Sequence, residues 1–423
     1  MKHVRAKVVA SSNTIEDRSS RGVKRVKVLE AAAKALNQHG VSQTSLAAIA
    51  EGVGVSRAAL YYYFYDQQDL VFQCYSQSCE RMVESLDNAA LGRDAPEKIN
   101  RFVDFLLAGD APECAALSEI AFLRAEQQDT ILGLLESVRA RLAGVLDEGA
   151  RRGELRPCRS GVVAASIIGL ISWLPTARRL PTSRELNQDD LLESVQSLLR
   201  IGIAADRRAP IAYQVLEFSS MSFPARQVFD AETMAAARRE AVTAAASWLF
   251  NLKGVDATPL EEIALRLGVT KKVIYHNVGD KETLVAECYR RAFQFYEEIA
   301  RSMEAYEGPG VDALCAGAHA LAEASLREDI TPLALVTGLE ALPERAREEI
   351  QISSERLRQM YLRVYAAGQA DGSIRKVNSQ AMMNIIPGSF EWLPKWFEAF
   401  DAFDHAAAPR EVAELLRLGL KPL

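Results

Sequence analysis

Two short stretches of the chain place hydroxyl, phenol, imidazole and cationic side chains at spacings that suit contact with DNA. In each stretch a predicted helix begins after a hydroxyl residue, Ser56 or Thr270, and polar residues occupy the side that faces away from its apolar positions. Such groups contact phosphate oxygens and base edges, and we expect Arg57 to read a base. The predicted DNA-binding residues are Thr44, Ser56, Arg57, Ala58, Tyr61, Tyr62 and Tyr63 in the first stretch, and Thr258, Thr270, Lys271, Lys272, Tyr275, His276 and Lys281 in the second.

Residue types used in catalysis form no recognisable pattern. The five histidines are scattered, and the sequence contains no glycine-rich phosphate loop, no nucleophile elbow and no metal-binding motif. The six cysteines form no C-x-x-C pair and no zinc-type cluster with histidine, so we interpret them as reduced thiols. The sequence therefore favours a protein that is not an enzyme and that needs neither a metal nor a cofactor.

A helix, a three-residue turn and a second helix are predicted to position the first set of residues. Hydroxyl and carboxylate side chains cap helix N-termini, and glycine ends a helix because it adopts a left-handed backbone at little cost. Apolar residues four positions apart share the buried side of a helix. The predicted positions are Thr44 and Ser56 as caps, Gly54 as the stop, Leu60 and Phe64 as inward-facing residues, and Asp66 as the cap of a further helix whose N-terminus could hold a phosphate.

The whole unit occurs twice. Residues 44–70 align with residues 258–284 without a gap, at a separation of 214. Further along, the separation grows to 219. Similarity at a separation of half the chain, in the head and again in the body, indicates that head and body were duplicated together. The residues that match at the larger separation are Gly149, Gly153, Arg156, Trp173, Leu174 and Pro175 with Gly368, Gly372, Arg375, Trp392, Leu393 and Pro394.

Both stretches resemble the DNA-binding domain of the TetR (tetracycline-repressor-like) transcription regulators. The first copy keeps the GVS turn, the LYYYF helix and the final Leu70, but has Gln67 where the family has a phosphate-binding lysine. The second copy keeps GVT, IY, GDKE and Lys281, and departs from the family pattern at Val278, where the first copy has Phe64. The resemblance implies an all-α fold in which each DNA-binding domain precedes a helical ligand-binding and pairing domain.

Composition agrees with a globular protein that touches nucleic acid at one end. The chain has 423 residues, of which 49% are apolar and 25% charged, and its net charge is −6. Eight basic and two acidic residues precede residue 29, so a basic arm leads into an acidic body. A solvated disordered tail is a compatible interpretation of this arm. We recognise no apolar run of about 18 residues and no signal peptide, and therefore expect a cytoplasmic protein that does not engage a membrane.

Helical periodicity and breaks at proline and glycine predict two tandem units joined by a linker. The linker has 24 residues, which span roughly 80 Å when extended, enough to return from one end of a helical body to the other. The predicted divisions are 1–22 as a basic disordered arm, 23–70 as the first helix-turn-helix domain, 71–203 as the first effector and pairing domain, 204–227 as the linker, 228–284 as the second helix-turn-helix domain, and 285–423 as the second effector and pairing domain.

The resemblance also implies that a small, mostly apolar ligand enters the helical bodies and changes the spacing of the reading helices. The sequence does not locate the pocket. A stripe of methionine and aromatic residues, with Trp392, Trp396 and Phe400 every four positions, is more typical of a core or a helix-pairing surface than of a ligand site. The candidate ligand-binding residues are Trp173, Met382, Met383, Trp392 and Trp396.

These observations lead to one main hypothesis and two alternatives. The chain is interpreted as a repressor in which both heads act as an intrachain pseudo-dimer on one asymmetric double-stranded operator and are released by a small-molecule effector. In the first alternative, the second half has lost DNA binding and serves as a pairing and sensing module in a higher homo-oligomer. The second, weaker alternative is a ligand carrier or enzyme that does not bind DNA.

Overall fold

The computed structural model describes residues 25–41, 44–109, 111–177, 186–217, 230–339, 342–392, 395, 400 and 403–423. Within these ranges the secondary structure is helical, and the only extended pairing is an isolated bridge between Ala204 and Ile374. The predicted all-α class is confirmed. The predicted basic arm, residues 218–227 of the predicted linker and Trp396 lie outside the described residues.

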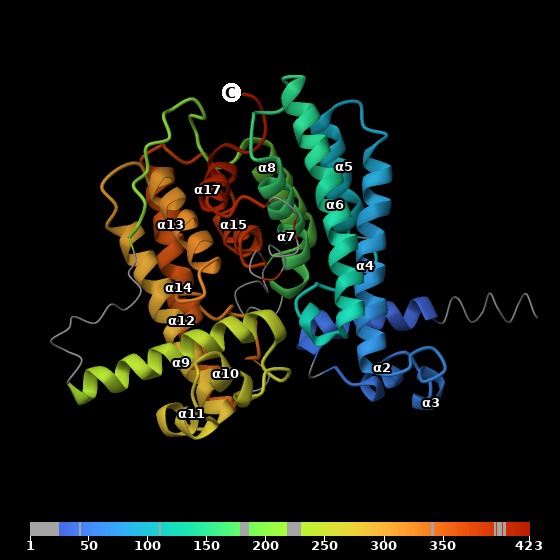
Figure 1. Cartoon of the computed structure of the whole chain (residues 1–423). Helices are drawn as coiled ribbons and strands as arrows, with labels where there is room; N and C mark the ends of the chain where they lie inside the picture. The colour runs from blue at the N-terminus through green and yellow to red at the C-terminus, as the bar shows by residue number, and fades with distance from the viewer. Residues whose placement is uncertain are drawn as a thin grey trace, which may run out of the picture.

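Each copy consists of a small head followed by a longer helical body (Figure 1). The first copy contains a helix over residues 25–41, then α2 (Leu46–Gly52), α3 (Arg57–Leu60), α4 (Gln67–Ala89), α5 (Ala95–Leu107), η1 (Ile120–Phe122), α6 (Ala125–Arg151), α7 (Ser160–Ala177) and α8 (Gln188–Ile201). The second contains α9 (Ala231–Lys253), α10 (Leu260–Arg266), α11 (Lys271–Val278), α12 (Lys281–Glu304), α13 (Gly310–Ser325), α14 (Glu344–Ala370), α15 (Ser379–Ile385), η5 (Ile386–Ser389) and α17 (Ala408–Leu418).

Local signals in the sequence explain the helices of the heads, with one correction. The hydroxyl of Ser56 accepts a hydrogen bond from the Ala59 amide, and Asp66 caps α4 in the same way, as predicted. Gly54 has φ +68°, which confirms the predicted helix stop. The predicted cap of α2 at Thr44 is wrong: Ser45 accepts the hydrogen bond from the Ala48 amide, and Thr44 lies one residue too early.

Helix α7 lies between the rest of the first body and the second copy, and its residues are apolar and nearly all buried. Its 18 residues have a mean hydropathy of 1.6, so by length and composition it could cross a membrane, and 83% of it is buried inside the protein. The expectation that no such apolar run exists is therefore wrong. Burial on all sides explains the composition, because a helix in the middle of a core needs no polar face.

The two copies pack against each other through equivalent helices. Helices α7 and α8 of the first copy contact α15, η5 and α17 of the second, which occupy corresponding positions in the repeat. At the centre, Gly169 faces Gly388 and the ring of Trp173 lies edge-on to that of Trp392, with ring centroids 6.2 Å apart. Each pair consists of residues 219 positions apart, so an approximate two-fold axis passes between them.

Backbone hydrogen bonds at the ends of α8 and α17 repeat the same symmetry. The Ile203 amide donates to the Leu416 carbonyl at 2.9 Å, and the Leu420 amide donates to the Leu199 carbonyl at 2.7 Å. Ile203 corresponds to Leu420, and Leu199 to Leu416, at a separation of 217 residues. Exchanging the two copies therefore converts each bond approximately into the other. An isologous contact of this kind is the signature of a two-fold interface, here formed within one chain.

Candidate DNA interface and effector cavities

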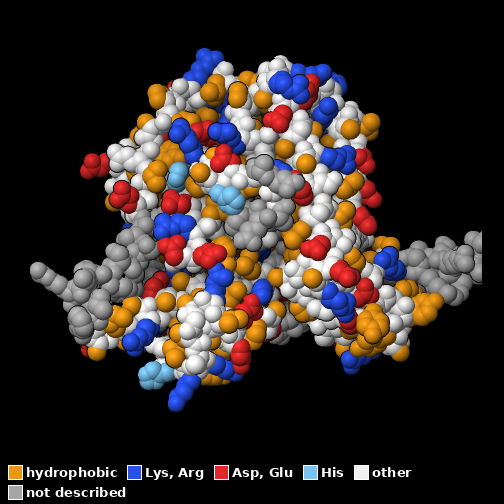
Figure 2. Space-filling model, in the orientation of Figure 1, with side chains coloured by type: hydrophobic (Ala, Val, Ile, Leu, Met, Phe, Trp, Pro, Cys, Tyr) orange, Lys and Arg blue, Asp and Glu red, His pale blue; other side chains and the backbone are white. Residues whose placement is uncertain are grey.

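The first head presents an exposed cluster of phenols and one guanidinium. Arg57 donates to the Tyr61 hydroxyl at 3.2 Å and lies 5.7 Å from the centre of that ring. Tyr62 is 70% exposed, whereas Tyr63 is half-buried and packs on the core. Ser56 and Ala58 are also exposed. Figure 2 shows hydrophobic side chains gathered on this head, at the lower right.

The predicted second helix of this head is shorter than expected. It ends at Leu60, and residues 61–63 form a turn, although Leu60 and Phe64 are buried as predicted. After the turn, Tyr65 is 83% exposed, and its amide donates to the Asp69 carboxylate at 2.8 Å. The sequence analysis missed Tyr65, because it predicted a DNA-reading helix that ends at Phe64, one residue before this tyrosine.

Thr44 and Thr258 do not reach the surface on which they were predicted to act. Their side chains are 3% and 0% exposed, and their hydroxyls donate to the carbonyls of Gly40 and Gly254 at 2.6 and 2.8 Å. Both residues therefore tie the end of the preceding helix to the head. A buried hydroxyl that is already bonded cannot also contact a phosphate, and we withdraw both residues from the candidate DNA contacts.

The second head carries its positive charge on the two-turn helix α11. Lys271 pairs with Glu261 at 2.6 Å, which raises the pKa of the lysine, and lies 5.5 Å from the ring centre of Tyr275. Lys272 is exposed and has no ion-pair partner among the described residues. Tyr275 and His276 are exposed, and Thr270 is the N-cap residue without a side-chain capping bond. These five residues all lie at or within α11 and are accessible to solvent.

The two heads use the first position of the following helix differently. In the first head, the Gln67 side chain donates to the carbonyls of Val41 and Thr44 at 2.8 and 2.9 Å, which fastens the head internally. In the second, Lys281 donates to the Asp256 carbonyl at 3.3 Å, and burial lowers the pKa of its ammonium group. Lys281 thus keeps a charge near the surface at a position where the first head has none.

A buried asparagine joins each head to its body, and sequence reasoning missed both. Asn37 donates to the Cys114 carbonyl at 2.8 Å and accepts from the Ala116 amide at 2.8 Å. Asn251 donates to the Pro332 carbonyl at 2.8 Å and accepts from the Ala334 amide at 2.9 Å. The two are identical residues at the separation of 214, on otherwise apolar helix faces. The recurrence of a buried-face asparagine at the same position of both repeats is the sequence signal that could have identified them.

A cavity of about 140 Å³ lies inside the second body, between α12, α13, α14 and α15. Of the candidate ligand-binding residues, Met383 and Trp173 line it, and the Trp173 indole donates to the Asn384 carbonyl at 2.8 Å. Met382 is buried and does not line this cavity. Trp392 lies in a turn after η5, so the predicted helical stripe does not begin there, and its ring packs on Trp173 at the two-fold axis.

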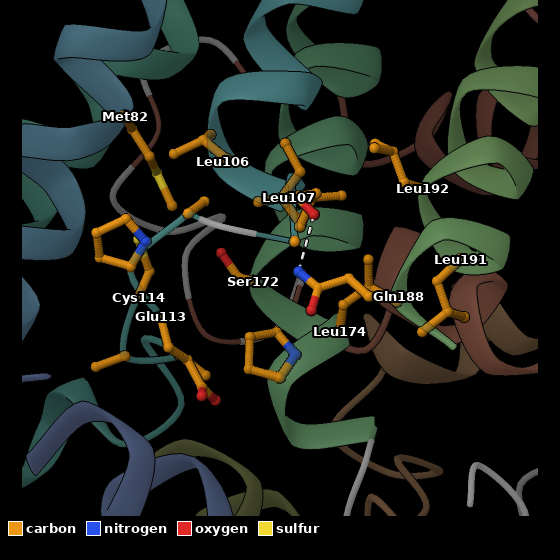
Figure 3. A pocket seen from close by; sticks show the side chains of 17 residues that line it. Met82, Leu106, Leu107, Glu113, Cys114, Ser172, Leu174, Gln188, Leu191 and Leu192 are labelled. Atoms are coloured by element: carbon orange, nitrogen blue, oxygen red, sulfur yellow. Dashed lines mark hydrogen bonds between the residues drawn. The ribbon is translucent and has the colours of Figure 1, made fainter. Parts of the chain in front are cut away.

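The first body has a cavity of about 190 Å³ with a different lining (Figure 3). Met82 of α4, Leu106 of α5, and Ser172 and Leu174 of α7 surround the same space. The Gln188 side chain closes one side and donates to the Leu107 carbonyl at 2.9 Å. Within the described residues no cluster of three metal-binding side chains is found.

Comparison with known families now assigns the heads and bodies. The family described as "Bacterial regulatory proteins, tetR family" matches residues 28–74 and 242–288, and "Tetracyclin repressor-like, C-terminal domain" matches residues 92–176 and 307–420. Together these matches cover more than half of the chain. The chain belongs to the TetR family. It is therefore a DNA-binding transcriptional regulator with two tandem TetR units, and not an enzyme.

Individual relatives match less than half of this chain but most of their own length. The HTH-type transcriptional regulator TtgR of Pseudomonas putida is 28% identical over 204 residues, which cover 44% of this chain and 92% of the relative. The fatty acid metabolism regulator protein of Bacillus subtilis is 25% identical over 139 residues, 31% of this chain and 71% of the relative. The crystal structure of AibR in complex with isovaleryl coenzyme A and operator DNA is 18% identical, covers 41% of this chain and 97% of that chain, and has a TM-score of 0.35.

Proposed function

We propose that this TetR-family regulator is a repressor in which one chain supplies both DNA-reading heads of an intrachain pseudo-dimer. The observation that carries this proposal is the reciprocal pairing of α8 and α17, in which the ends of the two helices exchange backbone hydrogen bonds. A two-fold pair of helix-turn-helix heads reads two half-sites about one duplex turn, ~34 Å, apart. Here the second copy occupies the position of a partner subunit.

The placement of the heads supports a common DNA target. Figure 1 shows α3 and α11 at the same end of the molecule, below the two bodies, and Figure 2 shows the heads as two separate lobes along that edge. The exposed groups that would meet DNA differ between them: Arg57 with Tyr61, Tyr62 and Tyr65 in the first, and Lys272 with Tyr275, His276 and Lys281 in the second. Unlike reading helices prefer unlike half-sites, so we propose an asymmetric operator.

We further propose that a small, mostly apolar effector enters a helical body and releases the DNA. The cavity in the second body supports this, because its lining is mainly apolar and includes residues of α12, the helix that follows the second head. A cytoplasmic location follows from a DNA target in a bacterial-type regulator.

The experiment that tests the proposal is a mobility shift on the DNA upstream of the protein's own gene, combined with the mass of the complex in solution. One chain per duplex, with binding weakened by Lys271→Ala and Lys272→Ala together, is the expected result. Two or more chains per duplex and no effect of the double substitution would support the alternative in which the second half only pairs and senses. That alternative is less favoured, because α7 and α8 already have their pairing partners within the chain.

A further inference from the structure

The cavity of the second body is apolar except at one wall. Helices α12, α13 and α14 contribute leucine, alanine and tyrosine side chains, and α15, η5 and Trp173 of the first copy line the remaining side. The apolar residues include Leu314, Leu321, Leu335, Leu357 and Phe390. A charged group that a ligand buries against this apolar lining loses its contact with water, so it needs a partner in the wall.

Glu391 supplies a carboxylate at this wall. The Tyr296 hydroxyl donates to its Oε1 at 3.3 Å, and both residues line the cavity. Burial raises the pKa of the Glu391 carboxyl to about 7, while the charge of Lys395 acts in the opposite direction. The carboxyl is therefore held in a place where an added positive charge would stabilise its ionised form.

The cationic side chains near Glu391 have partners of their own. Arg358, which also lines the cavity, forms a two-point ion pair with Glu355 at 2.8 and 2.6 Å. Lys395 donates to the Ser118 carbonyl of the first copy at 2.8 Å and lies 4.5 Å from the ring centre of Trp392. Arg358 is thus paired with Glu355, and the charge of Lys395 lowers the pKa of Glu391 by less than burial raises it.

The first copy lacks this arrangement at the equivalent positions. Glu391 directly precedes the repeated Trp-Leu-Pro segment, and the residue before that segment in the first copy is Ser172. Tyr296 corresponds to Met82 at the separation of 214. Both Ser172 and Met82 line the cavity of the first body, so at these two positions it offers a hydroxyl and a thioether where the second offers a carboxylate and a phenol (Figure 3). The carboxylate that does line the first cavity, Glu113, comes from a different position and accepts a hydrogen bond from Asn37 Nδ2 at 2.9 Å.

We propose that the second body recognises an apolar molecule that carries a protonated amine, with Glu391 as the partner of the amine and Tyr296 as its positioning residue, and that the first body does not bind this class. This inference rests on the proposed effector response and names the chemistry of its ligand. A buried ammonium group is stable only when a carboxylate accepts its hydrogen bond. Glu391 therefore determines whether the cavity prefers an amine to an uncharged ligand of the same shape.

The test uses three probes with the same apolar part, phenylbutylamine, phenylbutanol and phenylbutanoate, and calorimetry on the full chain at about pH 8, where both the amine and the Glu391 carboxyl are charged. We expect the amine to bind roughly tenfold or more tightly than the alcohol, and the acid to bind weakest. Glu391→Gln should remove that advantage and leave the alcohol unchanged within about twofold. Glu298→Gln, the same change on the exposed side of α12, should leave all three affinities unchanged.

Equal affinity for amine and alcohol, failure of the amine to bind, or an amine preference that survives Glu391→Gln would overturn the inference. Tyr296→Phe keeps the carboxylate and should reduce the amine preference only partly, which allows the test to proceed if Glu391→Gln does not fold. A mobility shift on the same preparations separates this inference from the proposed function. If the chain binds DNA but not the amine, only the proposed ligand class is contradicted. If the chain binds the amine but not DNA, only the proposed regulatory function is contradicted.

Discussion

Arg156 donates from Nε to the Gly419 carbonyl at 2.6 Å, and its repeat counterpart Arg375 donates from Nε to the Gly202 carbonyl at 2.7 Å. Each arginine therefore holds the glycine that ends the last helix of the other copy. These two bonds, made by arginines 219 residues apart in sequence, connect the copies in the way that subunits of a symmetric dimer are connected.

The glycine at the end of α8 should not tolerate a side chain. Gly202 has φ +63°, and a Cβ there would collide with the backbone of Arg417 and Leu418. Gly202→Ala should lower the free energy of unfolding by about 1 to 3 kcal/mol, measured by urea denaturation. Gly133→Ala, at an exposed position within α6 with open space around it, is the matched control and should raise it by about 0.5 to 1 kcal/mol. A similar effect of both changes would show that the end of α8 is not tightly packed against the end of α17.

Arg57 should contribute to base recognition by the first head. Arg57→Ala should weaken operator binding by about 1 to 3 kcal/mol and relax the preference at one base pair, because the exposed guanidinium is the only cation on α3. Binding to a set of operator variants, measured by fluorescence anisotropy, checks both effects. Arg93→Ala, whose side chain is 88% exposed on the body, serves as the control. An unchanged preference profile would exclude Arg57 as a base reader.

The two adjacent lysines of α11 should differ in their effect on DNA binding. Lys272→Ala should reduce the slope of log affinity against log salt by about 1, as expected when one phosphate contact is lost. Lys271→Ala should reduce it less, since Lys271 is already paired with Glu261 at 2.6 Å. Titrations at several salt concentrations give both slopes. Equal slopes for the two variants would mean that the ion pair between Lys271 and Glu261 breaks when the protein binds DNA.

Asn37 should hold the first head on its body. Asn37→Ala leaves the Cys114 carbonyl and the Ala116 amide without their side-chain partner, which costs about 1 to 3 kcal/mol in a buried site. Hydrogen exchange should increase in residues 44–64 and remain unchanged in residues 258–278. Asn251→Ala should produce the reverse pattern, so each variant is the control for the other. Exchange that rises in both heads would indicate that the heads are coupled through the bodies.

Glu391 should make stability depend on pH. Its folded pKa is raised from 4.5 to about 7, so the folded state binds a proton more tightly than the unfolded state. The stabilisation is complete below about pH 4.5 and is lost as the pH rises through about 7, with an upper bound of about 3 kcal/mol. Urea unfolding of the wild type and Glu391→Gln across this range should show the wild type falling relative to the variant as pH rises. A constant difference between them would contradict the raised pKa.

Local patterns determined the helical elements and most of the surface of the heads. Ser56 and Asp66 cap their helices, Gly54 ends α2, and Leu60 and Phe64 turn inward, because capping and periodicity depend on residues only a few positions apart. The alignment of Arg156 with Arg375 and of Trp173 with Trp392 identified the duplication from the sequence. Such an alignment compares residue types and needs no knowledge of contacts.

The tertiary structure alone decided which equivalent residues meet and which are buried. Trp173 and Trp392 were candidates for a ligand site as well as for a pairing surface, and only their edge-to-face contact placed them at the two-fold axis. The burial of Thr44 and the enclosure of Glu391 likewise depend on how separate helices pack. Spacing along a helix specifies a face, whereas the partner of that face is set by packing between segments some 200 residues apart, and no local pattern contains it.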